Sequence, residues 1–359
     1  MSRCLTPGPG RVGHPGLTTL RRVDAGGLTR VAAGVAALAA GVAAVVVVAL
    51  LLSHTPGPVQ AAAPPPSAPA AAPATTTTQA PASPPTSPAP AAFPTPPAGA
   101  VVFARAHGSN VLALAARPQG NRLLLQASVL GPQGNGVGGL TVSFTLEQRS
   151  AHAAACGAGC YRALLPTTTR PPRTVTVDVH GHTAPMQWRV ALPRRWPPAD
   201  AAALMTRAAR VWRSLRSFSF RERLASDASH SVTSVWRAVA PDRIAYQVKG
   251  GYSGVIIGGR RWDRAPGGRW VESSQTAPIR QPAPFWTSVT DAHVLGSATL
   301  QGHDTWRVSF FDPGTPAWFE VAIDKRTLHT LELFMFTTAH FMHDVYAGFD
   351  QAAGIRPPG

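Results

Sequence analysis

Alternating apolar and polar residues are the first regular pattern in this chain, and they predict β-strands. In NRLLLQASVL, Leu123, Leu125, Ala127 and Val129 alternate with polar neighbours. Successive side chains of a strand point to opposite faces, so this alternation gives one apolar face. The pattern returns in LTVSFTLEQ after the turn-rich GPQGNGVGG, and later in CYRALLP, RTVTVDVHG and APMQWRVAL. We therefore expect a small β-sandwich over residues 101–195.

Apolar residues recur every three or four positions between residues 200 and 218, which predicts one amphipathic helix. Pro197 and Pro198 end the preceding strand, and Asp200 is a suitable N-cap. The pattern favours a helix packed on a sheet with solvated arginines, and the alternative is a helix lying on an anionic membrane. The apolar positions are Leu204, Ala208, Val211, Trp212, Leu215 and Phe218, and the arginines are Arg207, Arg210, Arg213 and Arg216.

Short strand patterns, bounded by turn signals such as APGG and DPGTP, fill the chain from Phe218 to Phe349. One helix followed by about ten strands predicts an antiparallel meander. Because strands twist, such a sheet curls, and the helix can cover its concave face. The expected fold class is mainly β, with the β-sandwich followed by a curved antiparallel half-barrel and its covering helix over residues 196–359.

An uncharged segment of 22 residues, Val31 to Leu52, precedes all of these strands. At about 1.5 Å per residue, a helix of this length crosses a bilayer core of about 30 Å. We therefore expect a transmembrane helix at residues 31–53. The alternative is a cleaved secretory signal, for which Ala61, Ala62 and Ala63 offer small residues to a peptidase.

Basic residues lie on one side of this segment. Arg30 is the last of five arginines before it, and the next basic residue is Arg105. The positive-inside rule predicts that residues 1–30 form a cytoplasmic tail and that the later domains are extracytoplasmic. The chain would then be a single-pass protein of the plasma membrane. Residues 54–100 contain no charged side chain and are dominated by Ala, Pro, Ser and Thr, which predicts a disordered linker.

The formal charge of +16 does not indicate nucleic-acid binding. Only Lys249 and Lys325 are lysines, and no Lys/Arg-rich run is interleaved with aromatic residues. Catalytic motifs are also missing from the sequence, which has no G-x-S-x-G, H-E-x-x-H, P-loop or S-x-x-K pattern. We therefore expect a protein that is not an enzyme.

Two cysteines lie in CGAGC, at Cys156 and Cys160. Nearby thiols outside the membrane usually oxidise, and Gly157 and Gly159 free the backbone to fold tightly. A local disulfide is therefore the favoured interpretation. A Cu(I)-binding thiolate pair and free thiols are the alternatives.

The stretch TTAHFMHDVYAGF raises a second question about metal, because His340, Met342 and His343 lie within it. Its alternation and aromatic content predict a β-strand, which places the two histidines on opposite faces. We expect the face of Phe341, His343 and Val345 to be buried. His340 with Met342 would still be half of a soft copper site, and other residues would have to complete it.

Parts of the chain resemble known extracytoplasmic domains. The Gly-rich turn, GAGCYRALLP and the closing TVTVDV resemble FixH/YtkA-like immunoglobulin-type domains, which are often attached to copper-resistance membrane proteins. The stretches APDRIAYQVKGGYSGVIIGGRRWDRAPGGRW, SATLQGHDTWRVSFFDP, AWFEVAIDKRTLHTLELFMF and HFMHDVYAGFD resemble LolA-like domains, relatives of lipoprotein carriers and of mycobacterial lipid-binding lipoproteins. This second resemblance covers residues 200–358 and implies a half-barrel that binds lipid. A membrane anchor in place of a lipobox departs from those carriers.

Three functions follow as hypotheses. The first is a binding protein that holds a lipid, a lipoprotein acyl chain or a segment of a membrane-protein partner in a cleft that the helix fills only partly. It needs no cofactor. The second is copper handling by Cys156, Cys160, His340 and Met342, and the third is a surface adaptor for other proteins. The candidate wall residues of the cleft are Trp212, Trp236, Tyr246, Trp262, Trp270, Trp286, Trp306 and Trp318.

The membrane orientation is testable by protease protection. A tag placed after Gly359 should be cleaved by protease added to intact spheroplasts, whereas a tag placed before Arg11 should stay intact. The reverse pattern of cleavage would contradict the orientation.

Overall fold

The computed structural model describes most of the chain after residue 92. The predicted cytoplasmic tail, transmembrane helix and most of the linker lie outside the described residues. Among those residues, no helix is long and apolar enough to cross a membrane. The described residues are 93–167, 173–181, 185–275, 277, 279–338, 340–351 and 354–359.

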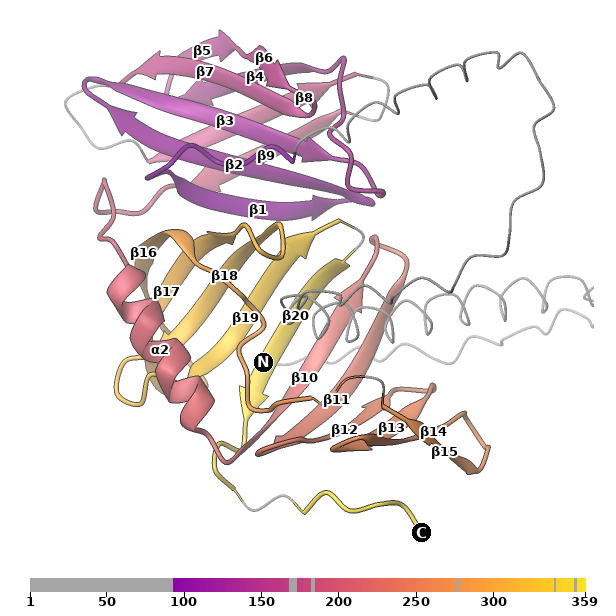
Figure 1. The fold of residues 1–359 in the computed structure, drawn as a ribbon. Helices are drawn as coiled ribbons and strands as arrows, with labels where there is room; N and C mark the ends of the chain where they lie inside the picture. Colours follow the sequence, from indigo (N-terminus) through magenta and orange to yellow (C-terminus); the bar gives the residue numbers. More distant parts are fainter. Residues whose placement is uncertain are drawn as a thin grey trace, which may run out of the picture. The chain divides into compact units, whose positions relative to one another are not determined.

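Two antiparallel sheets form from the strands between residues 101 and 191 (Figure 1). They enclose one apolar core, to which Leu114 and Leu125 contribute from one sheet and Phe144 and Val177 from the other. The first sheet has the order β1 (Val101–His107), β2 (Asn110–Gln119), β3 (Arg122–Leu130), β7 (Cys160–Pro166) and β6 (Ala154–Gly157). The second has the order β5 (Arg149–His152), β4 (Thr141–Leu146), β8 (Thr174–His180) and β9 (Met186–Ala191).

The chain just before β1 is packed against its neighbours, although the linker was expected to reach residue 100. The ring of Phe93 lies 5.2 Å from that of Trp318, centroid to centroid. The carbonyl oxygens of Pro94 and Thr95 accept hydrogen bonds from the side chains of β3. These contacts order the last eight residues of the stretch that composition alone assigns to the linker.

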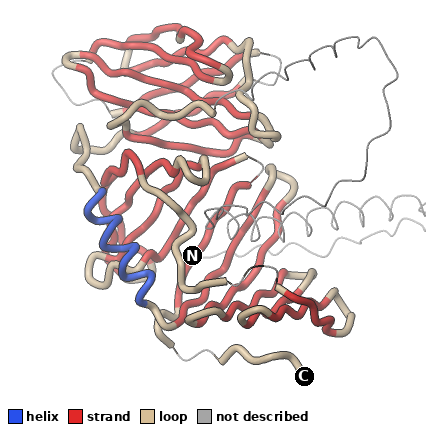
Figure 2. The backbone as a smooth tube through the Cα atoms, viewed as in Figure 1, coloured by secondary structure: helices blue, strands red, loops and turns tan. Residues whose placement is uncertain are grey.

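The rest of the chain forms an open, curved sheet of eleven antiparallel strands with one helix against it (Figures 1 and 2). The sheet has two arms that meet where β10 pairs with β20. Along the chain, the first arm runs from the middle of the sheet to one edge, and the second arm starts at the other edge and returns to the middle. The first arm is β10 (Ser217–Ala225), β11 (Ser231–Val239), β12 (Arg243–Val248), β13 (Ser253–Ile257), β14 (Arg260–Arg264) and β15 (Trp270–Ser274). The second is β16 (Thr290–Leu300), β17 (His303–Asp312), β18 (Ala317–Asp324), β19 (Thr330–Thr337) and β20 (His340–Ala347).

Helix α2 (Ala202–Ser214) buries Ala208 and Trp212 of the predicted apolar stripe, whereas Leu204 and Val211 are half-buried. The helix ends earlier than expected, because Leu215 is its C-cap and Phe218 already belongs to β10. Trp212 is 1% exposed, while the arginines of the helix point to solvent. The N-cap is Ala201 and not Asp200 as expected. Residue 200 instead forms a bridge with His293 of β16, and its carboxylate accepts a hydrogen bond from the Ala202 amide at 2.9 Å. Pairing with the sheet therefore moves the helix start by one residue.

The connection from β15 to β16 must join opposite edges of the same sheet. At about 4.8 Å per strand, these edges lie roughly 48 Å apart along the sheet. The fifteen residues 275–289 span at most about 50 Å when extended. This segment therefore has to run across one face of the sheet, as Figure 1 shows for the orange trace in front of β10 and β20. We call its continuous part, residues 279–289, the strap.

Asp312 fixes the strap at its β16 end. Its carboxylate, which is fully buried, accepts hydrogen bonds from the amides of Thr287 (2.7 Å) and Ser288 (3.1 Å) and from the Ser288 hydroxyl (2.6 Å). Gly314 and Thr315 also donate to it. Burial raises the pKa of Asp312, but these hydrogen bonds outweigh burial and bring the pKa below its ordinary value. The strap is thus held by a charged acceptor.

Replacing Asp312 by Asn should loosen the strap. Asparagine keeps one acceptor oxygen, but its amide NH₂ group would face the backbone N–H of Thr287, so two donors would meet. We expect the free energy of unfolding in urea to fall by about 2–4 kcal/mol at neutral pH. Because the pKa is lowered on folding, this stabilisation exists above about pH 4 and is lost as pH falls through the folded pKa. The difference from the wild type should therefore shrink in acid. Asp304→Asn, at an exposed position of β17, is the control, and an equal loss there would contradict the assignment.

Candidate functional site

Aromatic rings from three elements meet on the face of the sheet that carries α2 and the strap, here called the helix face. Trp212 of α2 contacts Tyr346 of β20 with ring centroids 4.9 Å apart, and it contacts Trp286 of the strap at 6.2 Å. Trp286 in turn lies 5.5 Å from Phe310 of β17 and 6.4 Å from Phe319 of β18. Helix and strap therefore share one aromatic core with the sheet.

The strap also covers the first arm of the sheet. Phe285 stands edge-on to Phe220 of β10, at 5.7 Å between centroids. Phe220 stacks on Trp236 at 5.7 Å, and Trp236 stacks on Tyr246 at 4.7 Å. An open cleft beside the helix was expected, but here the strap fills the space that the helix leaves. The aromatic surface is thus closed by the helix and, where the helix does not reach, by a loop.

The eight aromatic residues proposed as cleft walls are divided between the two faces. Successive residues of a strand point to opposite faces, and both faces of this sheet are covered by other parts of the chain. Aromatic residues are therefore buried on both faces. Trp318 packs with Phe93 and with β1 and β2, whereas Trp262 packs with Ile355 near the C-terminus. The helix face carries Trp212, Trp236, Tyr246, Trp286 and Trp306, and the opposite face carries Trp262, Trp270 and Trp318.

Two of the three residues on the opposite face are engaged with arginines. The guanidinium of Arg260 lies 4.7 Å from the ring of Trp262, and that of Arg264 lies 4.7 Å from the ring of Trp270. Glu272 accepts hydrogen bonds from Arg260 and from the Trp262 indole. These cation–π contacts stabilise the outer strands of the first arm and do not build a cleft.

Two neighbouring carboxyl groups lie in the middle of the helix face. No sequence pattern predicted this pair. Glu222 of β10 and Asp344 of β20 are cross-strand partners and are 7% and 0% exposed. One Glu222 oxygen, Oε2, accepts hydrogen bonds from Ser234 and from the Trp236 indole, both at 2.7 Å. Asp344 Oδ2 accepts one from the Tyr346 hydroxyl at 2.7 Å. Two acids thus share an apolar surface with few donors.

Burial controls the protonation of this pair. It raises the pKa of Asp344 well above the ordinary value, and the neighbouring Glu222 raises it further. Burial also raises the pKa of Glu222, although its two hydrogen-bond donors oppose this. Because Glu222 has more donors, we assign the negative charge to Glu222 and the retained proton to Asp344. Among the described residues, four buried side-chain polar atoms have no hydrogen-bond partner, and two of them, Asp344 Oδ1 and Trp212 Nε1, belong to the helix face.

Strand β20 confirms the β-structure expected for TTAHFMHDVYAGF, but its faces are reversed. The residues on the helix face are Met342, Asp344 and Tyr346, all buried. His343 lies on the opposite face, where its Nε2 is 2.9 Å from Glu332 Oε1. The prediction was wrong because Asp344 gives the helix face a charged residue in the sequence although this residue is buried. Phe341 and Val345 make the opposite face the more apolar one in the sequence. Of the opposite-face residues, Phe341 is also buried, against the packed chain near β1.

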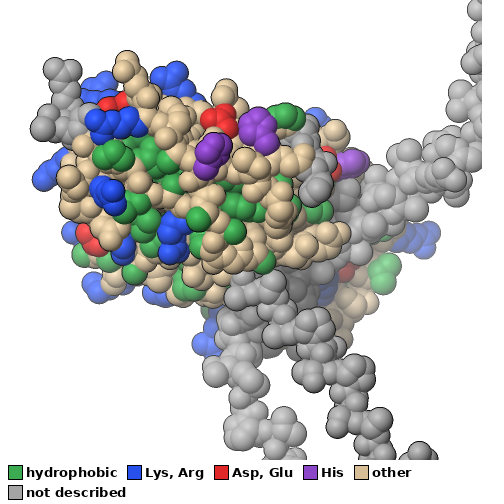
Figure 3. Space-filling model, turned by 90° about the horizontal axis from the view of Figure 1, so that it is seen from above, with side chains coloured by type: hydrophobic (Ala, Val, Ile, Leu, Met, Phe, Trp, Pro, Cys, Tyr) green, Lys and Arg blue, Asp and Glu red, His purple; other side chains and the backbone are tan. Residues whose placement is uncertain are grey.

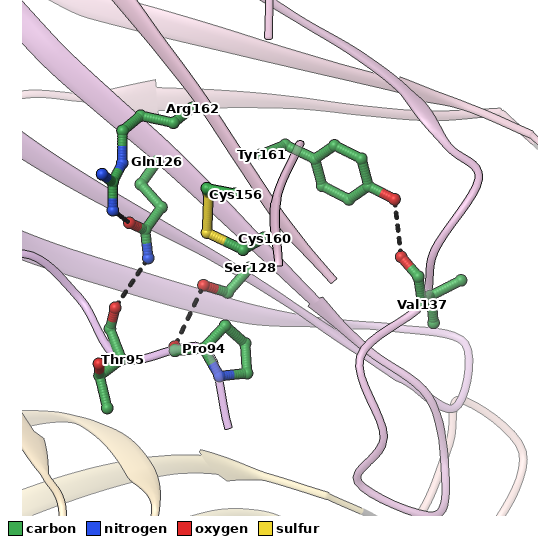
Figure 4. The surroundings of a disulfide bond; sticks show 9 residues. All are labelled: Pro94, Thr95, Gln126, Ser128, Val137, Cys156, Cys160, Tyr161 and Arg162. Atoms are coloured by element: carbon green, nitrogen blue, oxygen red, sulfur yellow. Dashed lines mark hydrogen bonds between the residues drawn. A yellow bond between two sulfur atoms is a disulfide. The ribbon is translucent and has the colours of Figure 1, made fainter. Parts of the chain in front are cut away.

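Cys156 and Cys160 are joined by a disulfide at the β6–β7 hairpin, with Cα atoms 5.0 Å apart (Figure 4). Neighbouring side chains in this view bind backbone oxygens, as Tyr161 does with Val137 at 2.7 Å. Bonded sulfurs offer no thiolate to Cu(I). Within the part of the chain that the structure describes, no three His, Cys, Asp or Glu side chains are grouped as a metal site would require. Copper binding by these cysteines with His340 and Met342 stays a prediction.

Charged side chains are scattered over the face seen in Figure 3. Lysine and arginine side chains form separate spots among apolar and neutral ones and do not merge into one basic area. This face therefore has no basic stripe of the kind that follows a phosphate backbone.

Comparison with known proteins gives distant likenesses only. No family model matches the chain. No curated protein is significantly similar to it. The expected likeness of residues 101–195 to FixH/YtkA-like domains therefore stays a prediction.

Several solved structures are similar to part of the chain. Lipoprotein LppX of Mycobacterium tuberculosis has 13% identity and a TM-score of 0.35, over 44% of this chain and 100% of that one. LprF of Mycobacterium bovis has 11% identity and a TM-score of 0.34, over 45% and 98%. A LolA superfamily protein of Nitrosomonas europaea has 9% identity and a TM-score of 0.20, over 40% and 91%.

Neutralising the buried acid should change how stability depends on pH. A carboxyl whose pKa is raised on folding binds more protons in the folded state, so stability falls as pH rises from about 4 to the folded pKa. Asp344→Asn removes this loss, and we expect the variant to be more stable than the wild type by about 1–3 kcal/mol at pH 8 and by less at pH 5. Urea unfolding at the two pH values measures the effect. Glu332→Gln, on the opposite face, is the control, and a destabilised Asp344→Asn at both pH values would contradict the assignment.

Proposed function

We propose that this chain is a membrane-anchored, non-enzymatic extracytoplasmic protein that holds a hydrophobic ligand on the helix face of its curved sheet. The ligand class is an acyl chain of a lipid or lipoprotein. The observation that carries the proposal is the strap, because a loop with two large rings, Phe285 and Trp286, fills the centre of an aromatic surface. A loop can leave such a surface without unfolding the sheet.

The energies of exchange are of similar size. A fully buried aromatic ring buries roughly 150–250 Å². Trp286 is buried and Phe285 is half-buried, so removing both from the core costs at most about 8–12 kcal/mol at about 25 cal/mol per Å². An acyl chain recovers about 0.8 kcal/mol for each buried methylene, so about twelve methylenes offset the displaced rings. A long acyl chain can therefore replace the strap, whereas a small apolar molecule cannot.

Anchoring supports the same proposal. The uncharged segment Val31–Leu52 would hold the chain at the membrane from which an acyl chain comes. The stretch from residue 54 to residue 92 would let the folded part move near that surface. A hydrophobic segment of a membrane-protein partner could occupy the same place, and the experiment below separates the two occupants.

Photocrosslinking in nanodiscs tests the proposal with the full chain. A phospholipid that carries a diazirine on one acyl chain should label peptides of the helix face, above all those that contain Trp212, Trp236 or Phe310. Labelling confined to residues 31–53 would contradict a lipid-binding sheet and would favour the protein-partner alternative.

Two tryptophans provide a matched pair of variants. Trp286→Ala removes a ring from the strap and should increase labelling of the helix face by several fold. Trp318→Ala removes an equally large buried ring from the opposite face and should leave labelling unchanged. Equal increases in the two variants would show that general loosening, and not the strap, controls access.

A further inference from the structure

The outward side of α2 is lined with arginines. They recur every three residues, so all of them lie on one side of the helix. This side faces away from the sheet, because Met205, Ala208 and Trp212 on the other side are buried. The guanidinium groups are exposed, and among the described residues none has a hydrogen-bond or ion-pair partner. The three residues are Arg207, Arg210 and Arg213.

No acidic residue within the helix or the strap balances these charges. Residues 202–214 and 279–289 contain neither Asp nor Glu. Arg280 of the strap is exposed as well, and its guanidinium has no partner among the described residues. The ring contact of Trp212 with Trp286 joins the two elements, which lie on the same side of the sheet (Figure 1). The charged side chains on the outer surface of helix and strap are therefore all positive.

A row of arginines without acids is an unusual surface for a helix that only meets water. Positive charges three residues apart lie close together and repel one another, whereas interspersed acids would stabilise the helix. An external anion removes this repulsion. Guanidinium groups suit phosphate in particular, because they donate two parallel hydrogen bonds to it and lose little hydration.

We propose that the outer side of α2, together with Arg280 of the strap, docks on the anionic phospholipid headgroups of the membrane in which the chain is anchored. The inference rests on the anchoring in the proposed function and adds the surface that the folded part meets. Each arginine beside an anionic bilayer strengthens binding by about fivefold. A few arginines bind weakly by themselves, but an anchor in the same membrane makes docking an intramolecular step.

The stretch from residue 54 to residue 92 is long enough for this step. As a random coil, a stretch of this length spans roughly 30–40 Å, which allows α2 to reach the bilayer surface. Docking through α2 also turns the strap toward the bilayer, because both lie on the helix face. An acyl chain that leaves the membrane then meets Phe285 and Trp286 first.

This arrangement differs from that of an interfacial helix. Such a helix buries its apolar side among the lipid chains. The apolar side of α2 is already packed on the sheet, so only its arginines are free to meet the membrane. Contact is therefore made with headgroups and depends on their charge, and we expect it to weaken as salt is added.

Headgroup photolabelling of the full-length protein in nanodiscs tests the inference. Every disc contains a trace of phosphatidylcholine with a diazirine on its headgroup. The bulk lipid is either phosphatidylcholine alone or a mixture with phosphatidylglycerol, and the readout is the amount of label on peptides of α2. We expect at least tenfold more label in the anionic discs, since three arginines act together. Most of this excess should disappear at about 1 M salt, where the screening length is about 3 Å.

Two triple variants with the same change in charge locate the docking surface. The first replaces the three arginines of α2 by glutamine, which keeps the helix propensity, and should reduce the label on α2 in anionic discs at least tenfold. The second replaces three arginines of β10 and β11 that are exposed on the opposite face, and it should keep the label. The control substitutions are Arg221→Gln, Arg223→Gln and Arg237→Gln.

Equal labelling of α2 in the two kinds of disc would overturn the inference, and so would an equal loss in the two triple variants. An acidic protein as the true occupant gives the first of these results, because the discs contain no such protein. The acyl-chain probe of the proposed function is a separate readout. If α2 is labelled from the headgroups and the acyl-chain probe labels only residues 31–53, the docking surface stands and the proposed function fails. If the acyl-chain probe labels the helix face equally in both kinds of disc while α2 shows no dependence on anionic lipid, the function stands and the docking surface fails.

Discussion

The position of β15 and β16 at opposite edges of one sheet is the constraint on which the rest of the structure depends. A meander that ends at one edge and resumes at the other has to send its connection across a face. The segment that makes this crossing also carries Phe285 and Trp286. Because of the strand order, a loop therefore covers part of the aromatic surface, and Asp312 holds one end of this loop.

The long sheet is packed on both of its faces, and this explains which predictions from sequence succeeded. Alternation located the strands, and a period of three to four located the helix, because one side of each element is buried in any packing. Which face of β20 meets the helix could not be predicted, since Phe341 and Tyr346 are both buried on opposite faces. The same ambiguity placed Trp318 and Trp262 among residues of the helix face. Alternation identifies two faces but does not say what covers either one.

The strap and the acid pair are the features that sequence reasoning missed. Residues 275–289 have no helical or strand period and contain three prolines, so they resemble an ordinary surface loop. The sequence does contain one indication, because Phe285 and Trp286 are adjacent in this segment. Large aromatic residues are uncommon in a loop that is surrounded by solvent. Nothing comparable marks Glu222 and Asp344, whose pairing follows from the register of strands that are far apart in sequence.

The acid pair and the strap lie on the same face of the sheet. A core selected only for stability would place apolar residues at both positions, since replacing buried charges by apolar groups is often neutral or stabilising. Under the proposed function, exchange of the strap for an acyl chain accounts for the loop, because a loop can leave the aromatic surface while the sheet stays folded.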